Sequence, residues 1–193
     1  MTICLFGAAS EKIDQKYKDA VEKLGYDLAR RGHDLIFGAG GNGLMGAAAR
    51  GVKAGGGKVI GVVPKFFRED NIESHYNDCD EFIECDTMNE RKQIMEDRCD
   101  AFVVVPGGIG TFDEFFEVLT NKQLGQHEKP IAVYNIDGFY DELDFMLYRV
   151  MSKGFIQSTC RMLYAIFGDA EDLFSYIEHI RPLGMTVKDY KKG

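Results

Sequence analysis

Short runs of consecutive apolar residues alternate along the chain with longer stretches in which apolar residues recur every three or four positions. The short runs predict strands, and their continuous apolarity indicates strands buried on both faces of a parallel sheet. The predicted strands are 3–6, 35–37, 59–63, 82–85, 101–105 and 131–134. The longer stretches predict helices at 14–31, 43–54, 88–98, 111–124, 140–153 and 170–180.

Strand and helix follow one another with short links, which is the pattern of βαβ units. The sequence therefore predicts an α/β fold, a Rossmann-like doubly wound parallel sheet flanked by helices, in a single domain. We expect that domain at residues 1–187, followed by a polar tail at 188–193 that frays. Residues 64–80 lack clear periodicity, and we expect either a lid or a plain surface loop there.

Charge and cysteine content narrow the class of protein. The chain has 23 Lys and Arg against 31 Asp and Glu, a net charge of −8. This opposes a general nucleic-acid binder, because binding a phosphate backbone requires clustered cations. The five cysteines form no C-x-x-C pair, so we expect reduced thiols in a cytoplasmic protein. No apolar run reaches the ~20 residues of a membrane span, and we expect no metal and no cofactor.

Glycine accounts for 22 of the 193 residues, and much of it gathers where a predicted strand ends and a helix begins. Such turns present N–H groups and the positive end of a helix dipole to anions. The first cluster, 38–46, contains G-x-G-x-x-G at Gly41, Gly43 and Gly46. No acid ends the following strand to bind a dinucleotide ribose, which opposes an NAD-linked oxidoreductase. Phosphate contact and close packing of the helix both remain open for these glycines.

The second cluster, P-G-G-I-G-T at 106–111, lacks the lysine of a P-loop, which opposes triphosphate chemistry. A monophosphate needs only N–H donors, a hydroxyl and a guanidinium group. Thr111 and Glu114 also have the spacing of a capping box, so a purely structural role stays open for both. Upstream, Arg91 and Arg98 share one helix face, which is either part of a site or an ordinary solvated face.

Two motifs considered together identify a family. M-N-E-R-K at 88–92 and P-G-G-I-G-T-F-D-E at 106–114 resemble the paired signature of the LONELY GUY family, the cytokinin riboside 5′-monophosphate phosphoribohydrolases. The similarity extends from about residue 3 to residue 180 and includes 40–46, 123–125, 129–130 and 135–140. Asn89 stands where the family often has His, a position that is not the catalytic one.

The resemblance implies an enzyme that hydrolyses the N-glycosidic bond of an adenosine 5′-monophosphate, often N6-modified, to a free base and ribose 5-phosphate. It also implies a homodimer. Arg91 and Glu114 match the catalytic pair. The substrate-binding set implied is Met88, Lys92, Arg98, Gly107, Gly108, Ile109, Gly110, Thr111, Phe112, Asp113 and Thr120. Relatives were once labelled lysine decarboxylases, but the sequence has no motif for a pyridoxal phosphate Schiff base.

A carboxylate beside the ribose would stabilise the oxocarbenium-like transition state and position water, and we assign that role to Glu114. Its position near a helix N-terminus favours the ionised form, which suits a base. Arg91 would orient Glu114 and the sugar. The main alternative is a non-catalytic carrier similar to the molybdenum cofactor carriers, which share the P-G-G-x-G-T turn. An interaction-only role would leave two anion-type turns unexplained.

Overall fold

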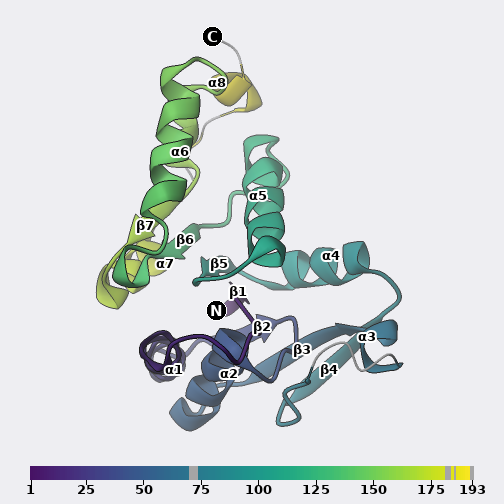
Figure 1. Cartoon of the computed structure of the whole chain (residues 1–193). Helices are drawn as coiled ribbons and strands as arrows, with labels where there is room; N and C mark the ends of the chain where they lie inside the picture. The colour runs from purple at the N-terminus through teal and green to yellow at the C-terminus, as the bar shows by residue number, and fades with distance from the viewer. Residues whose placement is uncertain (70–73, 181–183, 185, 192–193) are drawn as a thin grey trace.

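The computed structural model describes residues 1–69, 74–180, 184 and 186–191. These residues form one parallel sheet of seven strands in the order β4-β3-β2-β1-β5-β6-β7 (Figure 1). The strands are β1 (Thr2–Phe6), β2 (Asp34–Phe37), β3 (Val59–Pro64), β4 (Glu81–Cys85), β5 (Ala101–Val104), β6 (Ile131–Tyr134) and β7 (Ala165–Phe167). The predicted α/β fold with a doubly wound parallel sheet is confirmed.

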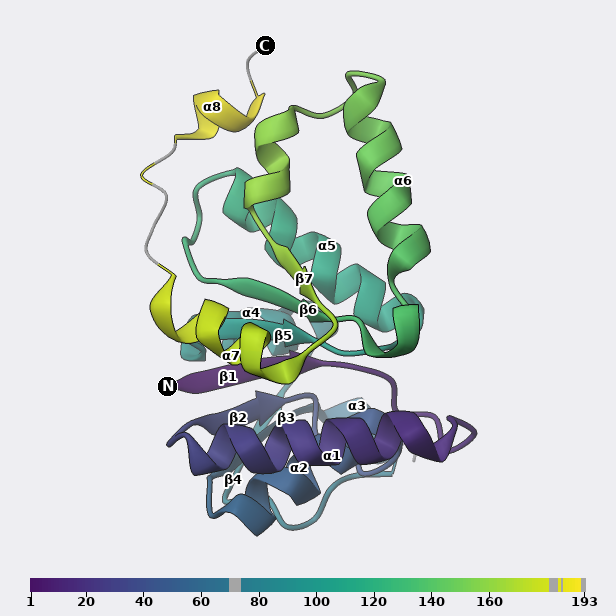
Figure 2. The same cartoon turned by 90° about the vertical axis from the view of Figure 1, so that its left-hand side faces the viewer.

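Helices cover both faces of this sheet. The helices are α1 (Gln15–Arg30), α2 (Gly43–Gly55), α3 (Lys65–Glu69), α4 (Met88–Arg98), α5 (Ile109–Gln123), α6 (Asp141–Ser152), α7 (Ala170–His179) and α8 (Val187–Lys191), with 3₁₀ turns η1 (Ile136–Gly138) and η2 (Ser158–Met162). Apolar residues of α1, α2 and α7 form one core cluster, and those of α4, α5 and α6 form a second on the opposite face. Figure 2 shows α1 and α2 on one side of the strands and α5 and α6 on the other.

Three elements differ from the sequence prediction. β7 is a short edge strand of three partly exposed residues, too short to leave a readable apolar pattern. The 64–80 segment contains α3, which follows β3 directly. The polar tail, expected to fray, contains α8, because Tyr190 is buried and only 6% exposed.

The two glycine turns lie at the same edge of the sheet. β1 pairs with β2 on one side and with β5 on the other, all parallel, so the carboxyl ends of the three strands meet there. The first turn follows β2 and the second follows β5. The strand order changes direction at β1, and ligands of open α/β sheets bind outside the carboxyl ends at such a point.

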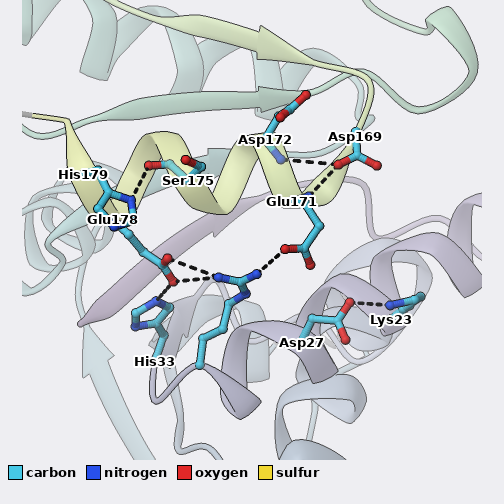
Figure 3. A network of polar contacts seen from close by, with 10 residues as sticks. Lys23, Asp27, His33, Asp169, Glu171, Asp172, Ser175, Glu178 and His179 are labelled. Atoms are coloured by element: carbon cyan, nitrogen blue, oxygen red, sulfur yellow. Dashed lines mark hydrogen bonds and ion pairs between the residues drawn. The ribbon is translucent and has the colours of Figure 1, made fainter.

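A polar network fastens the last long helix to the first crossover (Figure 3). On α7, Glu178 contacts His33 Nε2 at 2.9 Å and Arg31 Nη1 at 3.2 Å. Arg31 also pairs with Glu171, and Asp169 caps α7 by accepting from the backbone N–H of Glu171 at 2.8 Å. These contacts join α7 to the segment between α1 and β2, at the edge opposite the glycine turns.

Candidate active site

The second glycine turn opens onto the start of α5. The helix begins at Ile109 with Gly108 as its N-cap, and no side chain caps it. A Cβ atom on Gly108 or Gly110 would meet no other atom within 4 Å, and Ile109 is 90% exposed. Since the first N–H groups of a helix have no intrahelical acceptor, this end of α5 offers donors to an approaching anion.

The capping-box interpretation of Thr111 and Glu114 is wrong. α5 begins two residues earlier than the sequence predicted, so Thr111 is its third residue and Glu114 its sixth. Thr111 is buried beneath the turn, where a Cβ atom on Gly107 would lie 2.1 Å from its Oγ1. Helix capping therefore does not account for Glu114.

Tyr140 contacts the residues on both sides of the second turn. Its buried hydroxyl donates to the carbonyl oxygen of Val105 at 2.8 Å, just before the turn. Its backbone N–H donates to Asn135 Oδ1 at 2.6 Å, and its ring meets that of Phe112 edge-on at 6.1 Å. The motif at 135–140 thus acts as a support for the strand end that leads into the turn.

Arg91 lies on the first turn of α4 and is only 5% exposed. Its Nη2 donates to the carbonyl oxygen of Gly38 at 3.0 Å, and Nη1 lies 3.8 Å from Met88 Sδ. The Phe67 ring lies 5.7 Å from the guanidinium carbon. Nε is buried and has no hydrogen-bond partner among the described residues. A buried N–H donor without a protein acceptor is rare, and it suits a site that a ligand completes.

The first glycine turn has a different task from the second. A Cβ atom on Gly38 would lie 1.4 Å from Arg91 Nη2, so Gly38 makes room for the guanidinium group. Gly41 lies under the backbone of His75, and Gly46 under that of Gly41, with hypothetical Cβ contacts of 2.7 and 2.0 Å. Gly43 has a φ of +57°, in the left-handed region. Close packing accounts for the geometry of these three glycines.

Glu114 is partly buried on α5. Burial raises the pKa of its carboxyl to about 7, although Arg91 acts to lower it. The expectation that a helix N-terminus keeps Glu114 ionised is wrong, because desolvation outweighs the attraction of nearby cations. Near neutral pH the carboxyl exchanges between its protonated and ionised forms, as an acid–base group requires.

Lys92 lies one residue after Arg91 and pairs with acids of α5. Its Nζ is 3.1 Å from Asp113 Oδ2 and also contacts Glu117. Burial acts to lower the Lys92 pKa, but the hydrogen bonds to these two carboxylates raise it overall. Lys92 is therefore held as a cation beside the site, and it fixes the first turn of α4 against α5.

Two of the expected substrate contacts lie away from this cluster. Arg98 pairs with Glu81 at 2.7 Å, at the start of β4 and so at the opposite edge of the sheet. Thr120 lies roughly 16 Å along α5 from its first residue and lines an apolar hollow between α5 and α6. Arg98 and Thr120 therefore lie outside the candidate site.

Gly38, Phe67 and Tyr140 were absent from the predicted site residues. Tyr140 lies in a motif that matches the family, so its position carried a signal. Gly38 directly follows β2 at the start of the first glycine cluster, and Phe67 lies in the segment without periodicity. The contacts of Gly38 and Phe67 with Arg91 depend on the order of the strands.

The part of the chain that the structure describes shows neither a metal cluster nor a membrane-spanning helix. There, no three His, Cys, Asp or Glu side chains gather as they would to hold a metal ion. Within the same residues, no helix combines the length and apolarity needed to cross a membrane.

Comparisons with known proteins find relatives along most of the chain. The family model described as "Possible lysine decarboxylase" matches residues 45–177. The chain is 38% identical to cytokinin riboside 5′-monophosphate phosphoribohydrolase LOG2 of Arabidopsis thaliana, over 93% of this chain and 84% of the relative. It is 39% identical to cytokinin riboside 5′-monophosphate phosphoribohydrolase of Mycobacterium tuberculosis, over 89% and 90%.

A solved structure, the molybdenum cofactor binding protein of Rippkaea orientalis, has the same fold, with a TM-score of 0.69. The two chains are 22% identical, and the alignment covers 92% of this chain and 94% of the other. At that identity the likeness concerns the fold alone.

Proposed function

The chain belongs to the LONELY GUY family, and from that membership we propose that it hydrolyses the N-glycosidic bond of adenosine 5′-monophosphates, including N6-modified ones. The products are a free adenine-type base and ribose 5-phosphate. The observation that supports this most is the electrostatic coupling of Glu114 to the buried Arg91 beside the open start of α5. A helix end that binds phosphate and a carboxylate that titrates near neutrality together suit a nucleotide glycosidase.

The phosphate would bind at the first turn of α5. Gly108 and Gly110 have open space in front of them, so the backbone can approach an anion closely. Fixing the phosphate there holds the ribose near Glu114, the sixth residue of α5. Binding energy from the phosphate is thereby used to orient the sugar at the bond that is cleaved.

Glu114 would act in its ionised form. Breaking the C1′–N9 bond leaves positive charge on the ribose, which a carboxylate stabilises. The same carboxylate can accept a proton from the attacking water, because its pKa is about 7. The purine leaves with the bonding electron pair and takes up a proton.

Arg91 would position Glu114 and the nucleotide. It is anchored by Gly38, and it keeps an unused Nε donor among the described residues. A guanidinium group with a free donor can bind an oxygen of the ribose or phosphate. Its positive charge also opposes the rise of the Glu114 pKa and so favours the ionised form.

Base release distinguishes this enzyme from a carrier of the same fold. The chain is incubated with AMP and with N6-isopentenyl-AMP, and free base and ribose 5-phosphate are measured by chromatography. An enzyme releases both products in equal amounts, whereas a carrier binds nucleotide without releasing base. Lysine decarboxylation through pyridoxal phosphate fits less well, because Lys92 is held as a cation between two carboxylates rather than as a free amine.

We also propose a homodimer in the cytoplasm. Three large apolar side chains on and just after α6 are strongly exposed, and a second subunit could cover them. They are Phe145, Tyr148 and Phe155, with exposed fractions of 62, 63 and 82%. All five cysteines are free thiols, which supports a reducing compartment. Sedimentation of the wild type and of Tyr148→Glu tests the dimer, which the added charge should dissociate.

A further inference from the structure

A buried carboxylate on α4 has no task in the mechanism derived above. Glu96 is only 8% exposed. The side-chain nitrogen of Asn121, on α5, donates to both of its oxygens, at 3.0 Å to Oε2 and 3.3 Å to Oε1. An acid is almost never buried without a partner, and this partner belongs to the helix that carries Glu114. The contact joins the two neighbouring helices that hold the proposed catalytic pair (Figure 1).

The loop after α5 encloses the same carboxylate. His127 Nε2 lies 3.6 Å from Glu96 Oε1. It donates to the carbonyl oxygen of Val118 at 2.9 Å, while Nδ1 accepts from the backbone N–H of Lys129 at 3.2 Å. These two bonds assign the ring proton to Nε2, and burial lowers the pKa of His127 to about 4, so the ring is neutral. Lys129 Nζ also donates to the backbone carbonyl oxygen of Glu96. Glu96 is therefore held both from α5 and from the loop that follows it.

The Glu96–Asn121 contact lies one helix turn beyond the ion pair of Lys92 with Glu117. Glu96 follows Lys92 by four positions, and Asn121 follows Glu117 by four, a spacing that keeps side chains on one face of a helix. Glu114, three positions before Glu117, lies on that face of α5 as well. A single contact would let the two helices pivot about it. Two contacts about 6 Å apart fix the angle between the helices as well as their distance.

We propose that Glu96 and Asn121 are positioning residues that set the approach of Glu114 to Arg91. The inference rests on the proposed function, in which Glu114 and Arg91 act together. Glu117 is the pivot, with Asn121 four residues to one side and Glu114 three residues to the other. A tilt of α5 that opens the Asn121 end therefore moves Glu114 by a comparable distance. Arg91 stays in place, because the first glycine turn anchors it.

The charges around Glu114 make its separation from Arg91 measurable. Cations of α4 act to lower the pKa of the Glu114 carboxyl, and acids of α5 act to raise it. These groups are Arg91 and Lys92 on α4 and Asp113 and Glu117 on α5, with the buried thiol of Cys4 on β1 also close enough to interact. Arg91 has the largest effect among these charges, so a greater separation from it raises the pKa further. Asn121→Leu changes no charge, and a shift in that variant reports the separation.

The test compares kcat, KM and the titration of Glu114 in matched variants. Asn121→Leu and Glu96→Leu remove the contact, and each should lower kcat by about tenfold or more with little change in KM, because a misplaced reacting group slows the chemical step. The double variant should lose no more than either single one, since both changes break the same contact. Glu96→Gln keeps an oxygen that accepts from Asn121 and should retain most of the activity. Glu81→Gln breaks the exposed ion pair with Arg98 at the other end of α4 and, as the control, should change neither value.

Carbon-13 NMR of the glutamate carboxyls follows the titration directly, with Glu114→Gln identifying the signal. Asn121→Leu should raise the Glu114 midpoint by about half a pH unit or more. An unchanged or lowered midpoint overturns the proposal, and so does wild-type kcat in the leucine variants. A loss of kcat that Glu96→Gln shares with Glu96→Leu also overturns it, because the loss would then follow the charge and not the contact. The NMR result is independent of activity. A wild type that releases no base refutes the proposed function, while a raised midpoint still shows that Asn121 sets the approach of Glu114 to Arg91.

Discussion

The carbonyl oxygen of Gly38 accepts a hydrogen bond from Nη2 of Arg91 at 3.0 Å, although the two residues are 53 positions apart. A Cβ atom at Gly38 would lie 1.4 Å from the same nitrogen. The first glycine turn therefore holds Arg91, while the second exposes the start of α5. The two glycine-rich turns, alike in sequence, have separate tasks at one edge of the sheet.

Gly38→Ala should displace the guanidinium group and lower kcat/KM by about 100-fold or more, because small displacements at a reacting centre are costly. Overpacking should also cost about 1–3 kcal/mol of stability. Steady-state kinetics and thermal unfolding measure the two effects. Gly168→Ala is the control, since a Cβ there meets no atom within 4 Å. Wild-type activity in Gly38→Ala would refute the positioning role.

Glu114→Gln should lower kcat by more than about 100-fold, the size expected for acid–base work. In the wild type, kcat/KM should rise with pH below about 7 and level off above it, because the active form is the ionised carboxylate and its pKa is about 7. The rising limb should disappear from the residual activity of Glu114→Gln. A rate that instead falls above pH 7 would make Glu114 a general acid.

The same substitution should stabilise the fold at alkaline pH. The Glu114 pKa rises from 4.5 to about 7 on folding, so the native state resists ionisation and loses stability as pH rises through that window. A neutral glutamine removes this loss. We expect Glu114→Gln to be more stable by about 1–3 kcal/mol at pH 8 and equal to the wild type near pH 4. Denaturant unfolding at both pH values checks the sign.

Tyr140→Phe should weaken the support of the second turn. It leaves the carbonyl oxygen of Val105 without its 2.8 Å donor, which costs about 1–3 kcal/mol at a buried position. The KM for nucleotide should rise while kcat changes little. Tyr164→Phe is a matched control, because its buried hydroxyl has no hydrogen-bond partner among the described residues. Equal destabilisation by the two variants would contradict the role of Tyr140.

The fold could be predicted because its strands are buried on both faces and so read as continuous apolar runs. β5 shows this best, since all four of its residues are buried. β7 could not be recognised, because an edge strand of three partly exposed residues has no such run. Local pattern therefore determined the central strands and also β4, the other edge strand, but it failed at β7.

For the candidate site, the motifs could nominate residues but could not show how their surroundings act on them. Arg91 and Arg98 do share a helix face, yet seven residues of helix span about 10 Å and carry Arg98 to Glu81 at the far edge. The ionisation of Glu114 was inferred from its place in α5, whereas burial determines its pKa. Both errors come from tertiary distance and desolvation, which a local motif does not encode.

The network around Glu178 predicts a second and opposite pH effect. Burial acts to raise the Glu178 pKa, but His33 and Arg31 lower it overall. A lowered pKa stabilises the fold above about pH 4.5, and that contribution is lost as pH falls through the folded value. Glu178→Gln should therefore cost about 1–2 kcal/mol at neutral pH and progressively less below pH 4. Glu171→Gln should have little effect, because the Glu171 side chain is 72% exposed and its ion pair with Arg31 is screened by solvent. Comparable losses in both variants would contradict this prediction, because they would mean that solvent does not screen the exposed Glu171 pair more than the Glu178 pair.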